Sequence, residues 1–161
     1  MRKPRILLEG AWYHIIARIN RSEKIFDNNG IKNMFLSVVK KAREKRNPFR
    51  FEIANFCIMG NHIHFLIRPA PGNSLSRIMQ WILSVFAMRY NRFMKISGHV
   101  WYDRFKSIIV NGIRAFLAVS EYIDQNPVKA GLCLHPEDYE FCGAWHRERG
   151  LYTFLDKDIR V

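Results

Sequence analysis

Two histidines, His62 and His64, stand two positions apart at the start of an apolar run that is typical of a buried strand. Successive side chains of a strand point to opposite faces of the sheet, so these two imidazoles leave the same face and could bind one divalent metal. Tyr122 and Asn126 lie four positions apart near the end of a predicted helix, and they therefore share one helical face. The four residues together provide two imidazoles, an amide oxygen and a phenol.

These residue types fit one reaction, the cleavage of a phosphodiester. A metal held by His62, His64 and an amide oxygen could polarise a phosphate oxygen and stabilise the charge that develops during attack. Tyrosine forms covalent intermediates when its surroundings position or deprotonate it, which makes Tyr122 the candidate nucleophile. Each residue also has an ordinary structural explanation, because histidines in strands are often structural, buried aromatics are common, and Asn126 stands before a proline.

The composition suits one globular domain over residues 1–161, because 48% of the residues are hydrophobic and 14% are aromatic. No apolar stretch is nearly long enough to span a bilayer. We therefore expect a cytoplasmic, nucleoid-associated protein without a membrane partner. The chain has three cysteines, an odd number, and no Cys-x-x-Cys pair. Neither a disulfide framework nor a zinc knuckle is therefore indicated.

The net charge of +12 is concentrated in the main body of the chain. Residues 1–120 hold 21 Lys and Arg against 6 Asp and Glu, and no acidic residue occurs between Ile53 and Tyr102. A polyanion could lie on such a surface without meeting a carboxylate, and nucleic acid is the commonest partner of this kind. The residues expected to bind DNA flank the two histidines in sequence or offer a ring for stacking: Arg18, Arg68, Arg104, Lys106 and Trp101.

The hydrophobic periodicity predicts an α+β fold. Strands are expected at 11–20, 49–58, 62–68 and 104–110, and helices at 31–45, 74–93 and from 113 to a stop before Pro127, with Asp27 or Asn28 capping the first helix and Ser74 the second. The order βαββαβ is that of the ferredoxin-like architecture, an antiparallel sheet with helices on one face, here followed by an extra C-terminal helix that carries Tyr122. The first and third strands should lie side by side at the sheet centre. That would place the histidines in the middle of one open face.

Several segments resemble one family. Met59-Gly60-Asn61-His62-Ile63-His64 resembles the histidine-hydrophobe-histidine motif of the HUH endonuclease superfamily, and residues 121–132, Glu-Tyr-Ile-Asp-Gln-Asn-Pro-Val-Lys-Ala-Gly-Leu, resemble the tyrosine helix of its single-tyrosine transposases. The segment 98–107, Gly-His-Val-Trp-Tyr-Asp-Arg-Phe-Lys-Ser, resembles the branch associated with repetitive extragenic palindromes (REP), as does the Trp-Tyr-His at 12–14. The resemblance covers about residues 8–145 in the expected order.

The resemblance implies that the protein cleaves single-stranded DNA, often near a hairpin, through a 5′-phosphotyrosine and with release of a 3′-hydroxyl. It implies Tyr122 as nucleophile, His62 and His64 as ligands of Mg²⁺ or Mn²⁺, and Asn126 in the place of the third ligand. Other members have glutamine there, and Gln125 is adjacent, but it points about 100° away on an ideal helix. His14 matches no ligand and is expected to be a strand residue near the site. A homodimer is possible, as is a domesticated enzyme that serves chromosomal repeats.

Two other functions compete with this interpretation. A non-catalytic, ferredoxin-like module that binds single-stranded nucleic acid would hold the backbone with the basic body and stack bases on Trp12, Phe65, Trp101 or Tyr102, and it would need neither Tyr122 nor a metal. A metal-dependent nuclease with an activated water would need carboxylates near the metal. The absence of acidic residues between Ile53 and Tyr102 argues against that nuclease.

Overall fold

A computed structural model describes residues 7–161 of the chain. Four strands and four α-helices follow one another as β1 (Trp12–Arg18), α1 (Asn29–Ala42), β2 (Phe51–Ile58), β3 (His62–Pro69), α2 (Leu75–Met94), β4 (Lys106–Val110), α3 (Gly112–Lys129) and α4 (Gly143–Glu148). Short 3₁₀ turns lie at Asn20–Ser22, Ile25–Asp27 and Pro136–Asp138. The predicted α+β order is therefore confirmed up to β4, and α3 is the extra helix.

The four strands form one antiparallel sheet in the order β2-β3-β1-β4, with β1 and β3 paired at the centre. Their register places Arg18 opposite His62, and His14 opposite Leu66. Strands β2 and β3 form a hairpin through residues 59–61, as the turn residues predict. The histidines of β3 therefore lie beside β1, in the middle of the sheet.

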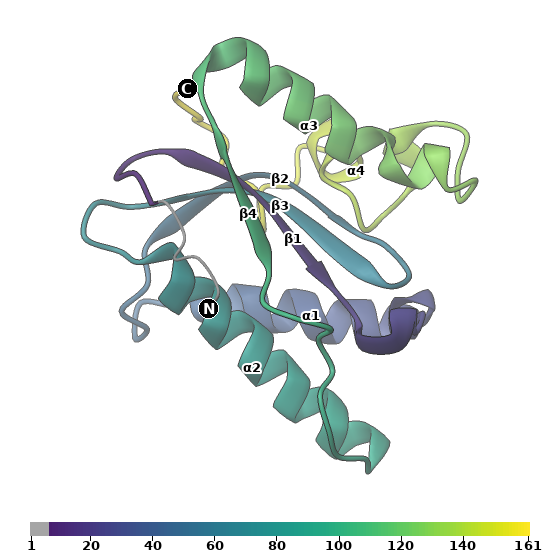
Figure 1. The fold of residues 1–161 in the computed structure, drawn as a ribbon. Helices are drawn as coiled ribbons and strands as arrows, with labels where there is room; N and C mark the ends of the chain where they lie inside the picture. The colour runs from purple at the N-terminus through teal and green to yellow at the C-terminus, as the bar shows by residue number, and fades with distance from the viewer. Residues whose placement is uncertain (1–6) are drawn as a thin grey trace.

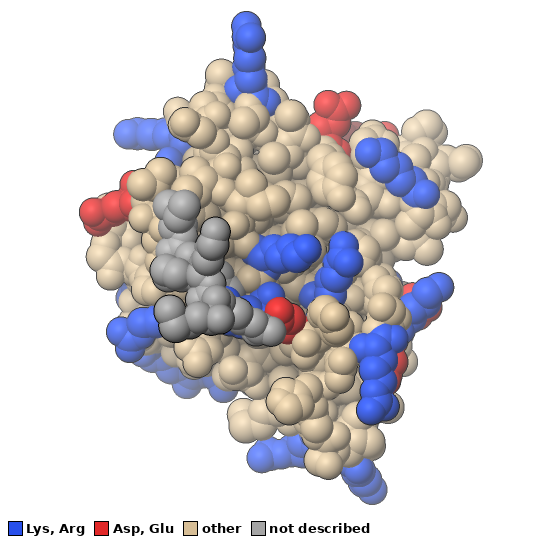
Figure 2. Space-filling view, viewed as in Figure 1, with Lys and Arg blue, Asp and Glu red and all other residues tan. Residues whose placement is uncertain are grey.

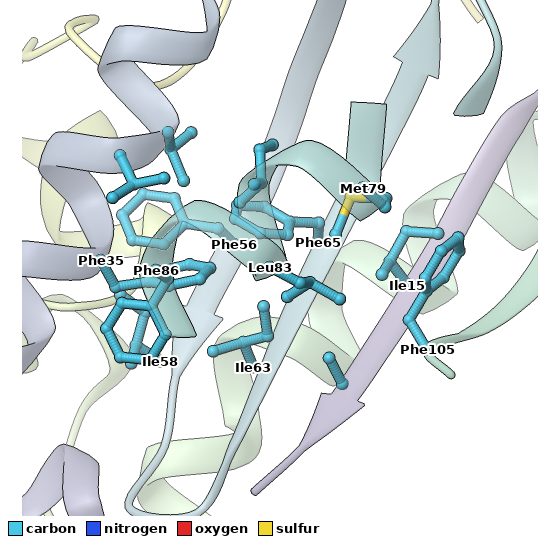
Figure 3. Packing of buried hydrophobic residues seen from close by; sticks show 14 of the residues in the cluster. Ile15, Phe35, Phe56, Ile58, Ile63, Phe65, Met79, Leu83, Phe86 and Phe105 are labelled. Atoms are coloured by element: carbon cyan, nitrogen blue, oxygen red, sulfur yellow. The ribbon is translucent and has the colours of Figure 1, made fainter. Parts of the chain in front are cut away.

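Helices α1 and α2 cover one face of this sheet, and α3 and α4 lie on the other (Figure 1). Alternate residues of β3, namely Ile63, Phe65 and Ile67, belong to the main core with α1 and α2. The ring centroids of Phe35 on α1 and Phe86 on α2 lie 5.2 Å apart, and the Phe35 ring also stacks on Phe65 of β3, with centroids 6.1 Å apart (Figure 3). Burial of this continuous apolar layer provides the main stabilisation of the fold.

Both predicted caps are present. The Asn28 side chain accepts hydrogen bonds from the backbone N–H groups of Gly30 and Ile31 at the start of α1, and the Ser74 hydroxyl accepts one from Arg77 N–H at the start of α2. Helix α2 ends at Met94, where Lys95 takes a left-handed conformation. The backbone leaves the helix there and returns toward the sheet through residues 96–105.

The predicted end of α3 before Pro127 is wrong, because the helix continues to Lys129 with Pro127 inside it. Pro127 stands in the last turn, so its missing N–H removes only one helical hydrogen bond. Gly131 adopts a left-handed conformation with φ +70°, and Leu132 N–H donates to Pro127 C=O while Gly131 N–H donates to Val128 C=O. This pair of bonds is a Schellman motif, which stabilises the helix end beyond the proline.

Candidate active site

The β2–β3 turn holds the histidine motif against the rest of the protein. Gly60 C=O accepts a hydrogen bond from Phe26 N–H, and Asn61 C=O accepts one from Ile19 N–H. A side chain at Gly60 would bring its Cβ to within 2.5 Å of an Asp27 carboxylate oxygen, so any residue other than glycine would require the Asp27 side chain to move. The start of β3 is thereby fixed at its first residue, His62.

His62 is oriented by its neighbour in the chain. The Nδ1 atom of His62 lies 2.7 Å from the amide oxygen of Asn61, whose Nδ2 faces the Ser22 carbonyl at 3.5 Å. An amide oxygen only accepts hydrogen bonds, so Nδ1 of His62 carries the proton and Nε2 carries the lone pair. Burial lowers the pKa of His62, and the nearby Arg18 guanidinium lowers it further.

His64 is almost fully buried, with 3% of its surface exposed. Burial lowers its pKa to about 3, and the neighbouring His62, His14 and Arg18 add to this effect, so the imidazole is neutral at neutral pH. Its Nδ1 lies 2.9 Å from Nε2 of His14. Its own Nε2 is buried and has no hydrogen-bond partner among residues 7–161, which leaves one nitrogen of this ring for a ligand.

Helix α3 brings Tyr122 against this pair of histidines. The ring centroid of Tyr122 lies 5.7 Å from that of His64 and 5.7 Å from that of His14, in edge-to-face contact with both. The phenol remains accessible, since Tyr122 is 44% exposed. The Lys129 ammonium lies 5.3 Å from the centroid of the same ring and places a positive charge beside it.

A buried asparagine on β2 ties α3 to the sheet. Asn55 is completely buried, and its Nδ2 donates to the carbonyl and hydroxyl oxygens of Ser120 and to a carboxylate oxygen of Asp124. It stands at an irregularity of the β2–β3 register between Ile53 and Asn55. Asp124 also pairs with Arg147 of α4. These bonds set the position of the helical turn that carries Tyr122.

Asn126 lies one helical turn after Tyr122, as the spacing requires. Its Nδ2 donates to the Tyr122 carbonyl at 2.7 Å, so Oδ1 is the atom that remains to act as a ligand. No hydrogen bond joins Asn126 or Gln125 to either histidine within the described part of the chain. The structure therefore unites Tyr122, His62 and His64, and leaves the choice of amide ligand open.

The residues present fit a divalent metal. The neutral imidazoles of His62 and His64 can each offer the Nε2 lone pair to a metal, and Nε2 of His64 is buried without a hydrogen-bond partner among the described residues. Within residues 7–161, His, Cys, Asp and Glu side chains form no group of three or more that could hold a metal. A metal at this site would need the two imidazoles together with an amide oxygen, water or a phosphate oxygen of the substrate.

The five expected DNA-binding residues lie in different environments. Arg18, Arg104 and Lys106 are exposed, and Arg18 stands directly beside His62 in the sheet register. Arg68, at the other end of β3, pairs with Glu52 at 2.6 Å and donates to the Arg160 carbonyl. These contacts make Arg68 part of the packing of the C-terminal segment.

Trp101 lies against the main core. Its indole N–H donates to the Leu83 carbonyl at 2.9 Å, and its ring contacts Phe26 and Phe86, so this placement does not favour stacking on a base. The adjacent Tyr102 is 72% exposed and is the aromatic residue available for that role. Lys and Arg side chains are spread over the face seen in Figure 2, several near its centre where β4 lies in Figure 1, and acidic side chains are few.

The contact between His14 and His64 was not anticipated from the sequence. A usable signal existed, because residues 12, 14, 16 and 18 of one central strand share a face with residues 62, 64, 66 and 68 of its antiparallel neighbour. The facing of two particular side chains depends on the register of the two strands, and that register became known only from the structure. The bond from His62 to Asn61 was also missed, because it depends on the side-chain conformations of two adjacent residues.

Comparisons with known proteins identify the family of the chain. The sequence model of the family described as transposase, IS200-like, matches residues 8–126. The chain therefore belongs to the IS200-like transposase family.

Solved structures show the same fold. A REP-associated tyrosine transposase bound to a REP hairpin superposes with a TM-score of 0.75 at 23% identity, over 100% of this chain and 94% of that one. A putative transposase from Deinococcus radiodurans R1 superposes with a TM-score of 0.50 at 14% identity, over 78% of this chain and 97% of that one. No curated protein matches the sequence. No helix among residues 7–161 is long and apolar enough to cross a membrane.

Proposed function

We propose that this transposase nicks and rejoins single-stranded DNA through a covalent 5′-phosphotyrosine on Tyr122. The observation that carries the proposal is the single cluster formed by Tyr122 of α3 with His64 of β3, beside His62. An accessible phenol next to two neutral imidazoles is a suitable arrangement for metal-assisted phosphoryl transfer.

His62 and His64 would hold Mg²⁺ or Mn²⁺ through Nε2, with the Asn126 amide oxygen as third ligand and Gln125 as the alternative. The bound metal would supply positive charge at a non-bridging oxygen of the scissile phosphate. The protein fixes the two rings through the backbone bonds of the turn, through Asn61 and through burial of His64. Such fixed ligands need no rearrangement when substrate arrives.

In the cleavage step, Tyr122 gives its phenolic proton to water and its oxygen attacks the phosphorus. The new bond joins the tyrosine oxygen to the 5′ phosphate, and the bond from phosphorus to the 3′ oxygen breaks. That oxygen takes up a proton from water and leaves as a 3′-hydroxyl, so protons, charge and electrons balance without a redox partner. Attack by a 3′-hydroxyl on the phosphotyrosine reverses these events and transfers the strand.

Hairpin DNA is the proposed substrate. The REP-associated structural neighbour is bound to a REP hairpin, and the exposed Arg18, Arg104 and Lys106 could hold phosphates near the histidines. Tyr102 could stack on an unpaired base. One chain contains every residue used here, and a dimer would allow two tyrosines to act on two strands.

The test incubates the protein with a single-stranded hairpin oligonucleotide and Mn²⁺, followed by denaturing electrophoresis. We expect a covalent adduct between the protein and the DNA on the 3′ side of the break, detected by a label on that part of the oligonucleotide. The other fragment should be released with a free 3′-hydroxyl. Chelation with EDTA should abolish the adduct. The variant Tyr122→Phe should form no adduct. Tyr152 is 40% exposed and lies outside the site, so Tyr152→Phe is its matched control.

Two results would reject the proposal. Cleavage by the wild-type protein without any adduct would favour a water nucleophile. DNA binding without cleavage under all metal conditions would favour the non-catalytic binding module.

A further inference from the structure

The inference concerns His14, which lies on β1 beside the proposed metal ligand His64. Its Nε2 lies 2.9 Å from Nδ1 of His64, and the two rings stack at 26° with centroids 5.1 Å apart. His14 is 6% exposed and His64 3% exposed, so water does not compete for this contact. A contact of this length between two ring nitrogens is a hydrogen bond, which needs one N–H and one lone pair.

Two arrangements of the proton satisfy the contact. If His14 donates, Nδ1 of His64 holds the lone pair and Nε2 of His64 carries the proton. That N–H would be buried with no acceptor among the described residues. If His64 donates, its Nε2 holds the lone pair, and this buried nitrogen can bind a cation. Only the second arrangement is compatible with the proposed metal site, because a metal binds the unprotonated nitrogen.

We infer that His14 is a positioning residue whose Nε2 accepts the Nδ1 proton of His64 and thereby keeps the His64 Nε2 lone pair available for a divalent cation. The inference rests on the proposed function for the identity of that cation. His14 does not bind the metal itself, because its Nε2 is occupied by the bond to His64.

The neighbouring ligand shows the same arrangement. Nδ1 of His62 donates to the Asn61 amide oxygen, just as Nδ1 of His64 would donate to His14. Both rings then present Nε2 from one face of β3. A partner on the second nitrogen of a ligating histidine fixes its tautomer and its ring orientation, and loss of such a partner commonly weakens metal binding by about 10- to 100-fold.

The first measurement is made on the metal-free protein. Nitrogen NMR of ¹⁵N-histidine-labelled protein should show His64 protonated at Nδ1 and unprotonated at Nε2, with scalar coupling across the bond to His14. A His64 found protonated at Nε2 would overturn the inference, whatever the metal binding. This measurement does not depend on the proposed function.

The second measurement is Mn²⁺ affinity by calorimetry. His14→Phe keeps the size and stacking of the ring but removes both nitrogens, so we expect the dissociation constant to rise about 10- to 100-fold and the fixed tautomer of His64 to be lost. His14→Gln, which offers an amide oxygen as acceptor, should recover part of the affinity and keep His64 protonated at Nδ1. Ile16→Val, on the same face of β1 and without a polar contact, is the matched control and should bind like wild type.

The outcomes separate the two ideas. If the wild type binds neither Mn²⁺ nor Mg²⁺, the metal step of the proposed function fails, while the NMR result still decides the role of His14. If the wild type binds Mn²⁺ and His14→Phe binds equally well with an unchanged His64 tautomer, the inference about His14 is wrong. An amide NMR spectrum of each variant shows that the fold is retained, and His14→Gln carries the test if His14→Phe does not fold.

Discussion

The two faces of the sheet differ in chemistry although the same strands build both. On the face covered by α1 and α2, Ile63, Phe65 and Ile67 of β3 enter a continuous apolar core. On the face covered by α3, His64 meets His14 from β1 and Tyr122 from α3, and His62 lies beside it. The period of two in a strand thus divides one segment between stability and chemistry. It follows that substitutions on the two faces should have separable effects.

The largest expected effect is the loss of chemistry from the α3 face. Tyr122→Phe removes only a hydroxyl from an exposed ring, so adduct formation with hairpin DNA should fall below detection. The free energy of unfolding should change by no more than about 0.5 kcal/mol, because substitutions at exposed positions rarely cost more. Denaturing electrophoresis and urea unfolding measure the two quantities. A variant that still forms an adduct would assign the nucleophile to another tyrosine.

Tyr102 would then be the next candidate. Tyr90 is a poorer candidate than Tyr102. It is 8% exposed, and burial raises the pKa of its phenol, so the phenol is both less accessible and harder to ionise. Mass spectrometry of the adduct peptide identifies the tyrosine directly.

The opposite face should show the reverse pattern. Phe86 is completely buried and contacts Phe26, Phe35 and Trp101, so Phe86→Ala should lower the free energy of unfolding by about 3–5 kcal/mol. At a temperature where the variant stays folded, its Mn²⁺ affinity should equal that of the wild type. Phe93→Ala is the control on the same helix, since Phe93 is 65% exposed. Loss of metal affinity in folded Phe86→Ala would show that the two faces are coupled.

The link between the sheet and α3 should give an intermediate effect. Asn55→Ala removes the donor to Ser120 and Asp124, which should cost about 1–3 kcal/mol because buried acceptors lose their partner. Adduct formation should fall even when the protein remains folded, because the turn that carries Tyr122 loses its anchor. Urea unfolding and the adduct assay measure these effects, with Asn33→Ala on the exposed side of α1 as control. An adduct yield equal to that of the wild type would show that Asn55 acts on stability alone.

The contrast between the faces was largely predictable from the sequence, because it follows from local patterns. Alternation along 62–68 assigned His62 and His64 to one face, and the expected caps, Asp27 or Asn28 for the first helix and Ser74 for the second, marked the starts of two helices. The end of α3 was not predicted. The preference of Pro127 to stop a helix was outweighed by the Schellman motif at Gly131.

Contacts between distant segments were beyond sequence reasoning. The pairing of His14 with His64 depends on the register of two strands that are 50 positions apart in the sequence. The capture of Arg68 by Glu52 and by the Arg160 carbonyl depends on the path of a C-terminal segment that has no periodic pattern. Trp101 was expected to stack on DNA because it offers an aromatic ring, and the residue type alone does not distinguish a core indole from an exposed one.

The smallest expected effect is on the pH dependence of the unfolding free energy, which should also differ between the two faces of the sheet. Four histidines, His14, His62, His64 and His146, have pKa values lowered mainly by burial, and three of them belong to the candidate site. A group with a lowered pKa in the folded state binds fewer protons than it does in the unfolded chain. Its full contribution to stability is therefore present above about pH 6.5, the ordinary value, and is lost as pH falls through the folded-state pKa.

His146 allows this linkage to be tested away from the candidate site, because it packs on Phe56 and Phe154. Below pH 6.5 the unfolding free energy of His146→Leu should fall less steeply with pH than that of the wild type, because the variant takes up at most about one proton fewer on unfolding. Urea unfolding between pH 7.5 and 4 measures this slope. His135→Leu is the matched control, because His135 is exposed, and its profile should follow that of the wild type. The remaining pH dependence of His146→Leu should then come from the histidines of the α3 face, and bound Mn²⁺ should steepen it, because a metal-bound imidazole takes up no proton in the folded state whereas the same histidine still does so in the unfolded chain. An unchanged profile in His146→Leu would show that acid destabilises the protein through other groups.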